Sequence, residues 1–123
     1  MQVVKTDKAP GAIGPYSQGI IANGMFYASG QIAIIPETGE IADGDIKVQA
    51  KQVCENIKEL LKAAGTSYEN VVKTTCFLAE MSDFAAFNEV YAGYFVSKPA
   101  RSCVAAKALP KNVLCEIEVI ATV

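Results

Sequence analysis

The distribution of apolar and polar residues predicts strands toward both ends of the chain and helices in its middle. We expect an edge strand over Met1 to Thr6 and two more strands over Ser17 to Ala22 and Met25 to Ile35. Asn23-Gly24 separates the latter two, and this dipeptide is a strong signal for a tight hairpin turn. Pro36 to Gly39 supplies the next turn.

The middle of the chain carries two helical patterns. From about Asp45 to Ala64, apolar residues recur at helical spacing on one face, lysines and glutamates fill the other, and Gly65 is placed to end the helix. A second helix is expected to be capped by Ser82 or Asp83 and stopped by Pro99, because a residue before proline avoids helical geometry. Its apolar positions are Phe84, Phe87, Tyr91, Tyr94 and Phe95.

Three further strands complete the predicted sheet. Val71 to Leu78 is rich in β-branched residues, and Arg101 to Ala108 and Val113 to Val123 follow, with Leu109 to Asn112 as the turn that would join the last two. In the first of these strands, alternation puts Val71 and Phe77 on one face and Val72, Cys76 and Leu78 on the other. Since two helices can cover only one face of a sheet, we expect another copy of the chain to cover the second face.

The residue types present exclude several classes of protein. The chain has 123 residues, of which 51% are hydrophobic and 20% charged, so it suits one packed domain over residues 1–123. It contains no histidine, which excludes a Ser-His-Asp triad, a Cys-His pair and an imidazole base. No metal site is expected, because no Cys-x-x-Cys spacing occurs among Cys54, Cys76, Cys103 and Cys115.

Charge and hydropathy limit the partners. The net charge is −2, the isoelectric point is about 5.1 and no dense basic run occurs, so nucleic acid is not an expected partner. No apolar stretch approaches the roughly 20 residues that span a bilayer, so no membrane association is expected. The first residues lack the apolar core of a signal peptide, and we therefore expect a cytoplasmic protein.

Arg101 is the strongest indication of chemistry. It is the only arginine, it opens a predicted strand, and its neighbours are small or apolar. A guanidinium presents a planar fork of donors that binds a carboxylate through two hydrogen bonds, which lysine cannot do. A surface or structural ion pair is the other interpretation of this residue. Cys103 shares its strand face and is expected to shape a pocket wall, because no histidine is present to activate the thiol.

Glu116 and Glu118 add carboxylates to the same predicted region. If the last two strands form a hairpin with a four-residue loop, odd positions of the first share a face with even positions of the second. The two glutamates would then lie on the same face as Arg101 and Cys103, where one of them could orient a water molecule beside a bound acid. We favour Glu116 for this role and expect Glu118 to face solvent.

Four weaker candidates come from the rest of the chain. Tyr16 ends the Gly/Pro-rich loop that begins at Ala9 and offers a phenol, and Asn88 offers an amide on the second helix. Ser29 places a small hydroxyl beside Gly30, where the backbone can approach a ligand closely. Each has an ordinary structural interpretation, because tyrosines pack in cores, glycines form turns and amides occupy helix surfaces.

Taken together, these motifs resemble the RidA family, also called the YjgF family. The matching segments occur in the right order over nearly the whole chain: Ala12 to Gln18, Tyr27 to Gln31, Phe87 to Tyr91, Pro99 to Val104, and Leu109-Pro110 followed by Glu116 to Glu118. The one departure is Cys115, where an aliphatic residue usually precedes the glutamate, and this is a conservative change in the core.

The resemblance implies an α+β, chorismate-mutase-like fold with a mixed sheet and two helices packed on one face. It further implies a homotrimer around a central β-barrel, with clefts between neighbouring subunits. The implied activity is hydrolysis of 2-imino acids and their enamines, such as 2-iminobutanoate and 2-iminopropanoate, to 2-oxo acids and ammonia. No cofactor or metal would be needed. Pyridoxal-phosphate enzymes release such reactive species, so the role would be metabolite damage control.

By position, Arg101 matches the family's carboxylate-binding arginine. The other positions that match its pocket are Tyr16, Ser29, Gly30, Asn88, Cys103 and Glu116. Our hypothesis is that Arg101 clamps the substrate carboxylate and Glu116 orients the attacking water. Tyr16, with backbone groups near Cys103 and Gly30, would hold the imine nitrogen.

Two other functions are open to the same sequence. One is a non-catalytic, trimeric regulatory protein that binds small carboxylates in the same cleft. The other is a ribonuclease or translation inhibitor, which the missing histidine, the acidic isoelectric point and the lack of a basic patch disfavour.

Overall fold

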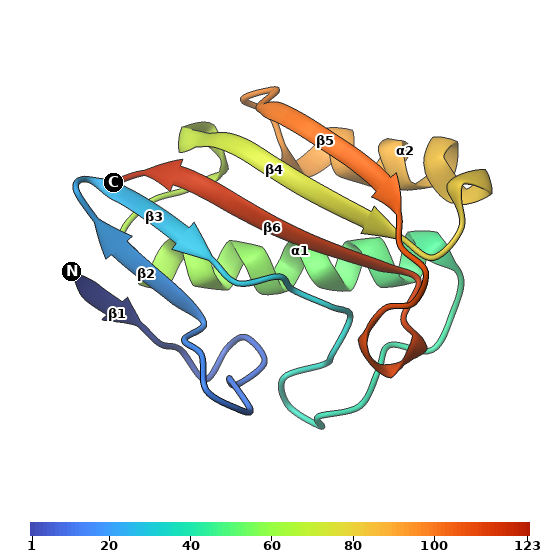
Figure 1. Cartoon of the computed structure of the whole chain (residues 1–123), viewed down its shortest axis with the longest axis horizontal. Coiled ribbons are helices and arrows are strands. Elements are labelled where there is room, and N and C mark those ends of the chain that lie inside the picture. Colours follow the sequence, from blue (N-terminus) through green and yellow to red (C-terminus); the bar gives the residue numbers. More distant parts are fainter.

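Six strands form one sheet, and both helices lie against the same face of it (Figure 1). The computed structural model describes all residues from 1 to 123. The strand order is β1-β2-β3-β6-β4-β5, and every neighbouring pair is antiparallel except β4 with β5. The strands are β1 (Gln2–Val4), β2 (Gly19–Ala22), β3 (Met25–Ala28), β4 (Val71–Leu78), β5 (Ala100–Ala105) and β6 (Cys115–Thr122). The expected α+β class with a mixed sheet is confirmed.

The first three strands follow the sequence pattern. β1 pairs only with β2, so the predicted edge strand at the start of the chain is confirmed. The turn between β2 and β3 has a φ of 52° at Asn23 and 75° at Gly24. Left-handed backbone at both central residues is what a tight hairpin turn requires, and asparagine and glycine tolerate it best.

The helix α1 (Ile46–Ala63) also agrees with its prediction. The Asp45 carboxylate accepts a hydrogen bond from the Val48 N–H at 3.1 Å and so caps the first turn. Gly65 follows the last turn with a φ of 79°, a conformation that glycine adopts without strain. The apolar side of α1 is fully buried against the sheet, where it meets residues such as Phe26 and Ile117.

The helix α2 (Phe84–Tyr94) begins where expected but ends earlier. A short 3-10 turn (Met81–Asp83) leads into it, and Asp83 stands at the cap position without a side-chain capping bond. The helix ends at Tyr94, well before Pro99, so the prediction that proline stops it is wrong. The cause is Phe95, which leaves helical geometry and is buried against the rings of Tyr91 and Tyr68.

The last two strands do not form the predicted hairpin. β4 lies between them: it pairs in parallel with β5, with Thr74 opposite Arg101, and antiparallel with β6, with Phe77 opposite Glu116. The physical reason is that β4, α2 and β5 make one strand-helix-strand unit. A helical crossover returns the chain parallel to the strand it left, and β5 therefore takes the edge position beside β4. β6 then pairs with the other side of β4.

Two smaller predictions also need correction. A β-bulge between Val71 and Lys73 turns Val71 into the core and leaves Val72 exposed, the reverse of the simple alternation.

The predicted strand from Met25 to Ile35 ends at Ala28. Beyond it, the buried Asn56 amide on α1 donates hydrogen bonds to the carbonyls of Ile32 and Ile34, at 3.2 and 2.8 Å, and so draws this segment away from the sheet.

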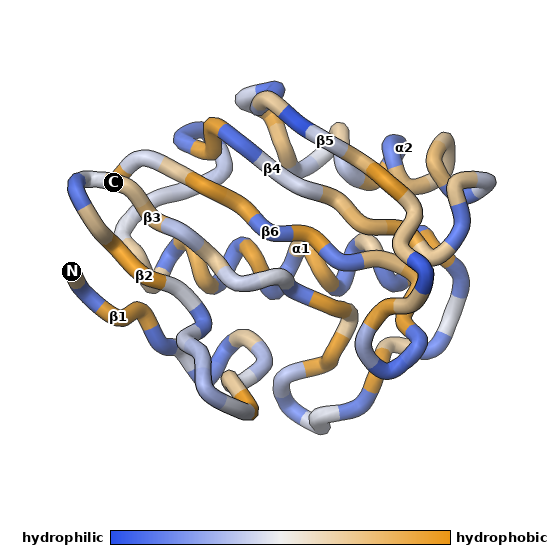
Figure 2. The backbone as a smooth tube through the Cα atoms, in the orientation of Figure 1, coloured by the Kyte–Doolittle hydropathy of each residue, from blue (hydrophilic) through white to orange (hydrophobic).

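No element of the chain covers the second face of the sheet. Buried and less buried positions alternate along β6, so one set of its side chains reaches the core and the other set lies on this open face. The hydropathy also alternates along the first part of the strand (Figure 2). Three large apolar side chains are strongly exposed there: Val3 (57%), Tyr27 (45%) and Val104 (49%). This face therefore leaves apolar area in contact with water.

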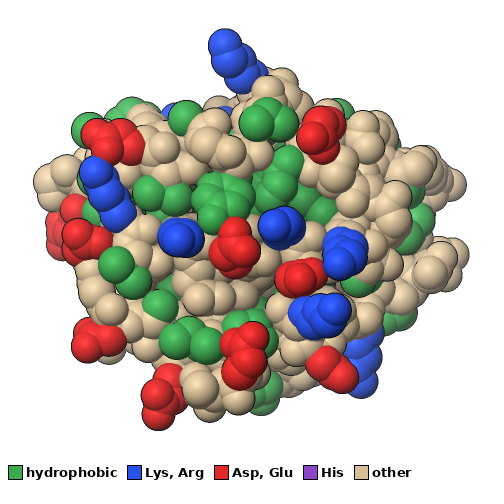
Figure 3. Space-filling view, turned by 180° about the vertical axis from the view of Figure 1, so that it is seen from behind, with side chains coloured by type: hydrophobic (Ala, Val, Ile, Leu, Met, Phe, Trp, Pro, Cys, Tyr) green, Lys and Arg blue, Asp and Glu red, His purple; other side chains and the backbone are tan.

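Charged side chains of both signs are interspersed on the side seen from behind Figure 1 (Figure 3). The one salt bridge within 4.0 Å joins Lys47 of α1 to Glu89 of α2. Neither helix is long and apolar enough to cross a membrane. The view shows no continuous basic patch of the kind that binds nucleic acid.

The Asn56 contacts give a test of the fold. Asn56→Leu removes the amide donor from both carbonyls and leaves that of Ile34 without a partner, whereas the Ile32 carbonyl keeps the Ile34 N–H at 2.8 Å. The free energy of unfolding should therefore fall by about 1–3 kcal/mol. Gln52→Leu, one turn earlier on α1, removes only a bond to Asn56 itself and should cost about 1 kcal/mol or less. Urea denaturation at a fixed protein concentration measures both, and equal losses would contradict this account of the segment.

Candidate functional site

The predicted site residues form two groups on opposite faces of the sheet. Asn88 of α2 meets Arg101 of β5 on the helix-covered side, and the Cys103 side chain shares that side. Four other residues line a hollow on the open side: Tyr16, Ser29, Gly30 and Glu116. The prediction that Arg101 and Cys103 share a face with Glu116 and Glu118 is wrong, because it depended on the hairpin that β4 interrupts.

Arg101 is held by α2 but is not neutralised. Its Nη1 donates a hydrogen bond to the Asn88 side-chain carbonyl at 2.8 Å, and no carboxylate lies within 4.0 Å of it. The interpretation of Arg101 as part of a structural ion pair is therefore wrong. A guanidinium has five N–H donors, and only this one bond to a side chain is formed.

A hollow of about 540 Å³ lies beside the guanidinium. Its lining residues are Asn88, Tyr91, Ala92, Phe95, Val96, Lys98, Pro99 and Arg101. The half-buried positive charge therefore has room beside it for an anion, and its unused donors are suited to bind a carboxylate.

Cys103 offers its backbone rather than its thiol. Burial raises the pKa of the thiol, and the nearby Arg101 lowers it less, so the sulfur stays protonated at neutral pH. The Ala106 N–H donates to the Leu78 carbonyl, which fixes the direction of alternate amides along β5. The N–H groups of Arg101 and Cys103 consequently point to the free edge of the sheet.

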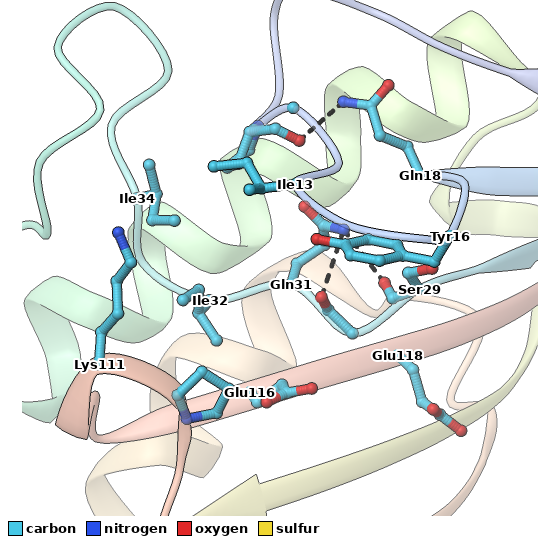
Figure 4. A pocket seen from close by; sticks show the side chains of 14 residues that line it. Ile13, Tyr16, Gln18, Ser29, Gln31, Ile32, Ile34, Lys111, Glu116 and Glu118 are labelled. Atoms are coloured by element: carbon cyan, nitrogen blue, oxygen red, sulfur yellow. Dashed lines mark hydrogen bonds between the residues drawn. The ribbon is translucent and has the colours of Figure 1, made fainter.

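The open-face hollow measures about 670 Å³ (Figure 4). Glu116 projects into it from β6, and the segment that follows β3 passes close above. A side chain at Gly30 would collide with the Glu116 carboxylate and displace it from its present position, so glycine keeps the carboxylate where it lies. The Gly30 N–H donates no hydrogen bond within the chain and is free for a ligand.

Burial is the main cause that raises the pKa of Glu116, and the neighbouring Glu118 carboxylate adds to it. Both effects oppose ionisation, because a carboxylate loses solvation in the hollow and meets a like charge. A glutamate with a raised pKa is better able to take a proton from water near neutral pH than an ordinary one. Glu118 lines the same hollow but is exposed, as expected.

Ser29 and Tyr16 play different parts in this hollow. The Ser29 hydroxyl donates to the Ser17 carbonyl at 2.6 Å, and its N–H donates to the Gln18 carbonyl. Ser29 therefore ties the segment after β3 to the segment before β2. The Tyr16 side chain is 55% exposed at the mouth, and its phenol has no partner within the chain. It is therefore free to contact a ligand.

Two buried glutamines were missed by the sequence interpretation. The Gln18 amide receives the Thr6 N–H at 2.8 Å and donates to the carbonyls of Thr6 and Pro10, which fixes the start of the loop that ends at Tyr16. The Gln31 amide donates to the Ser29 carbonyl at 3.1 Å. The only signal was a long polar side chain within a run of small and apolar residues, which does not reveal its partners.

No group of three or more cysteine, aspartate or glutamate side chains comes together in a way that could hold a metal ion. The four cysteines are all free thiols, and Cys54, Cys76 and Cys115 are buried. The ionisable side chains that line the two hollows are one arginine, two lysines, two glutamates and two tyrosines: Arg101, Lys98, Lys111, Glu116, Glu118, Tyr16 and Tyr91.

Comparison with known proteins identifies relatives over the whole chain. A family model described as "Endoribonuclease L-PSP" matches residues 6–123. The putative regulator AldR of Lactococcus lactis is 52% identical over 124 residues, covering 100% of this chain and 98% of that protein. The human 2-iminobutanoate/2-iminopropanoate deaminase is 48% identical over 121 residues, covering 98% and 88%.

A solved structure of a relative matches equally well. The crystal structure of Escherichia coli TdcF with bound serine superimposes with a TM-score of 0.95 at 44% identity, and covers 100% of this chain and 99% of that one. A family match over nearly the full length and relatives near 50% identity settle the relationship. The chain belongs to the endoribonuclease L-PSP family, which is the RidA or YjgF family that its motifs resemble.

Proposed function

We propose that the protein hydrolyses small 2-imino acids, such as 2-iminobutanoate and 2-iminopropanoate, to 2-oxo acids and ammonia. The observation that carries the proposal is the lone Arg101 guanidinium, which has no carboxylate partner and has a hollow beside it. Such a group is suited to a small acid. The human relative named as a deaminase for these two compounds supports the reaction type.

The substrate would bind between two copies of the chain. Arg101 on β5 lies opposite Thr74 on β4, which lies opposite Val119 on β6, three residues beyond Glu116. Two strand spacings across the sheet and three residues along β6 correspond to about 14 Å between the Cα atoms of Arg101 and Glu116. They also project from opposite faces, so a four-carbon acid cannot touch both within one chain. The uncovered apolar face of the sheet and the free edge of β5 both support assembly with another copy. We propose the homotrimer that the family resemblance implies.

In this composite site the reaction needs few steps. Arg101 of one copy, beside Asn88, binds the carboxylate of the imino acid through two bonds. A water molecule held by Glu116 of the next copy attacks the C=N carbon, and the Glu116 carboxylate accepts one proton from this water. Glu116 passes this proton to the nitrogen, which gives a neutral carbinolamine. Glu116 then takes the proton of the new hydroxyl group and delivers it to the nitrogen as the C–N bond breaks, so that ammonia leaves and the C=O bond of the 2-oxo acid forms.

The remaining groups would stabilise the charge that develops. The N–H groups of Gly30 and Cys103 and the Tyr16 phenol are unpaired within the chain and could surround the reacting nitrogen and oxygen. The Ser29 oxygen can still accept a bond although its proton is used. Imine hydrolysis already proceeds in water, so positioning and proton transfer are sufficient, and a positioned base commonly contributes about 10²–10⁴-fold.

Arg101 is the proposed anchor for the substrate carboxylate. Arg101→Ala should lower kcat/KM by at least about 100-fold, because two charge-assisted bonds to the carboxylate are lost. Arg101→Lys should recover little of this, since lysine lacks the planar fork. Lys51→Ala, on the exposed side of α1 and outside both hollows, is the control and should change kcat/KM less than about threefold.

The assay couples a threonine dehydratase to the protein and follows ammonia and 2-oxobutanoate. The oligomeric state and melting temperature of each variant are checked first. A folded, assembled Arg101→Ala protein with near-normal turnover would refute the assigned role.

The proposed site is shared between copies of the chain. Arg101→Ala and Glu116→Gln should each be almost inactive alone. When they are unfolded together in equal amounts and reassembled, three quarters of randomly mixed trimers contain both variants, and each has one intact site, so about one quarter of wild-type activity should return. Failure to recover activity, with mixed trimers demonstrated by mass spectrometry, would show that the two residues do not meet across an interface.

The proposed role of Glu116 makes activity depend on pH. Glu116 must be ionised to accept a proton, so kcat/KM should fall as the pH is lowered through its pKa, after uncatalysed hydrolysis is subtracted. Because the Glu118 charge raises this pKa, Glu118→Gln should move the acid limb to lower pH. Arg101 of a second copy would lower the pKa of Glu116, so the pH at which activity falls is not predicted. The test is the direction in which Glu118→Gln moves that pH. A shift to higher pH would contradict the role of Glu116.

A non-catalytic regulatory protein that binds small carboxylates is the second candidate, and the relative named as a putative regulator favours it. Binding of 2-oxobutanoate with no acceleration of imine hydrolysis would decide for this function. The family description also raises RNA as a substrate. RNA cleavage that survives purification and is lost in Arg101→Ala or Glu116→Gln would decide for that activity.

A further inference from the structure

The guanidinium of Arg101 rests on a stripe of three side chains from α2. Phe84, Asn88 and Tyr91 are four and three residues apart and therefore lie on one side of the helix. The Arg101 Cζ atom lies 4.7 Å from the centre of the Tyr91 ring and 5.4 Å from that of Phe84, and Nη1 bonds to Asn88. The guanidinium is thus fixed both at one nitrogen and against two ring faces.

The Tyr91 ring is itself held in place. Its hydroxyl forms a 2.7 Å hydrogen bond with Thr74 Oγ1, and both residues are buried, Thr74 at 1% exposure. Thr74 lies directly opposite Arg101 in the parallel pair of β4 and β5. The Phe95 ring stacks on Tyr91 at 4.1 Å between centroids, and a ring and a guanidinium at these distances cannot share one face. Tyr91 is therefore clamped between Phe95 and Arg101.

This arrangement exceeds what packing requires. A phenylalanine would fill the space of the Tyr91 ring equally well, and a valine would replace Thr74, without a polar pair in the core. The hydroxyl pair instead fixes the position of the ring along the direction of β4. A flexible arginine loses rotamer freedom when it binds an anion, and a side chain that is already ordered loses less.

We infer that Tyr91, held by Thr74, is a positioning residue that keeps the Arg101 guanidinium oriented with its free donors toward the incoming carboxylate. The inference rests on the proposed function for the identity of the substrate, but the ordering of Arg101 can be observed without turnover. Tyr91 acts through Arg101 and does not itself take part in the reaction. Its loss should therefore weaken substrate binding and leave the chemical step unchanged.

The kinetic test uses graded variants. Tyr91→Leu removes the ring and should raise KM for 2-iminobutanoate about tenfold, with kcat within about twofold of wild type. Tyr91→Phe and Thr74→Val each remove only the hydroxyl pair and should raise KM about threefold. The double variant should be no worse than either single one, because both changes break the same bond. Tyr94→Phe is the matched control, since its hydroxyl donates to Glu55 instead, and it should leave KM unchanged.

The spectroscopic test exploits the presence of only one arginine. The side-chain Nε–Hε group gives a single signal in an ¹H–¹⁵N NMR spectrum, which Arg101→Ala assigns by its disappearance. Ring currents from Tyr91 and Phe84 should displace this signal from the position of free arginine. Tyr91→Leu should move it back, Tyr91→Phe should broaden it, and Tyr94→Phe should leave it in place. Titration with 2-oxobutanoate should shift the wild-type signal at lower concentration than the signal of Tyr91→Leu.

The outcomes separate the inference from the function. A wild-type signal at the free-arginine position, unmoved by Tyr91→Leu, overturns the inference whatever the turnover. Equal 2-oxobutanoate affinity in the wild type and in folded Tyr91→Leu also overturns it. A displaced signal and weakened titration in Tyr91→Leu support it, even if the wild type fails to hydrolyse imines. In that case only the proposed catalysis is lost.

Discussion

The structure is organised around one positive charge that the chain does not neutralise. Arg101 lies half-buried at the edge of the sheet with an amide and two aromatic rings for neighbours, and no carboxylate within 4.0 Å. Partial burial of an uncompensated charge costs free energy unless an anion approaches. The aromatic faces and the Asn88 carbonyl offset part of this cost but leave most of the donors unused. In the proposed function, the carboxylate of a small acid would supply the missing negative charge.

The second constraint is the separation of this charge from the carboxylate that would do the chemistry. Glu116 lies on the other face of the sheet, in a hollow whose shape depends on Gly30 and on the loop held by Gln18. Arg101 and Glu116 line different hollows, so neither hollow contains both of the residues that the proposed reaction needs. Function in this account therefore depends on assembly. The contact between copies that covers the exposed apolar face of the sheet would also bring the Arg101 hollow of one copy to the Glu116 hollow of the next.

The sequence predicted the local elements well because their signals are local. Asp45 marks the start of α1 through its capping carboxylate. Gly65 and Asn23-Gly24 mark the end of α1 and the first hairpin through the backbone conformations that these residues tolerate. The order of the strands was not predictable in the same way. The predicted four-residue turn from Leu109 to Asn112 is compatible with a hairpin, and only the crossover through α2 puts β4 between β5 and β6. Because of that one error, the prediction put Glu116 on the same face as Arg101, whereas it lies on the opposite face.

The candidate site was predicted residue by residue but not as a geometry. Arg101 was recognisable because it is the only arginine, whereas the role of Tyr91 depends on the distance to a side chain on another element. The most direct test is a crystal structure of the protein with 2-oxobutanoate. The account predicts the carboxylate of the acid at about 2.7–2.9 Å from two Arg101 nitrogens, with its 2-oxo carbon facing Glu116 of a neighbouring copy. A ligand bound elsewhere, or an Arg101 side chain directed into open solvent, would contradict it.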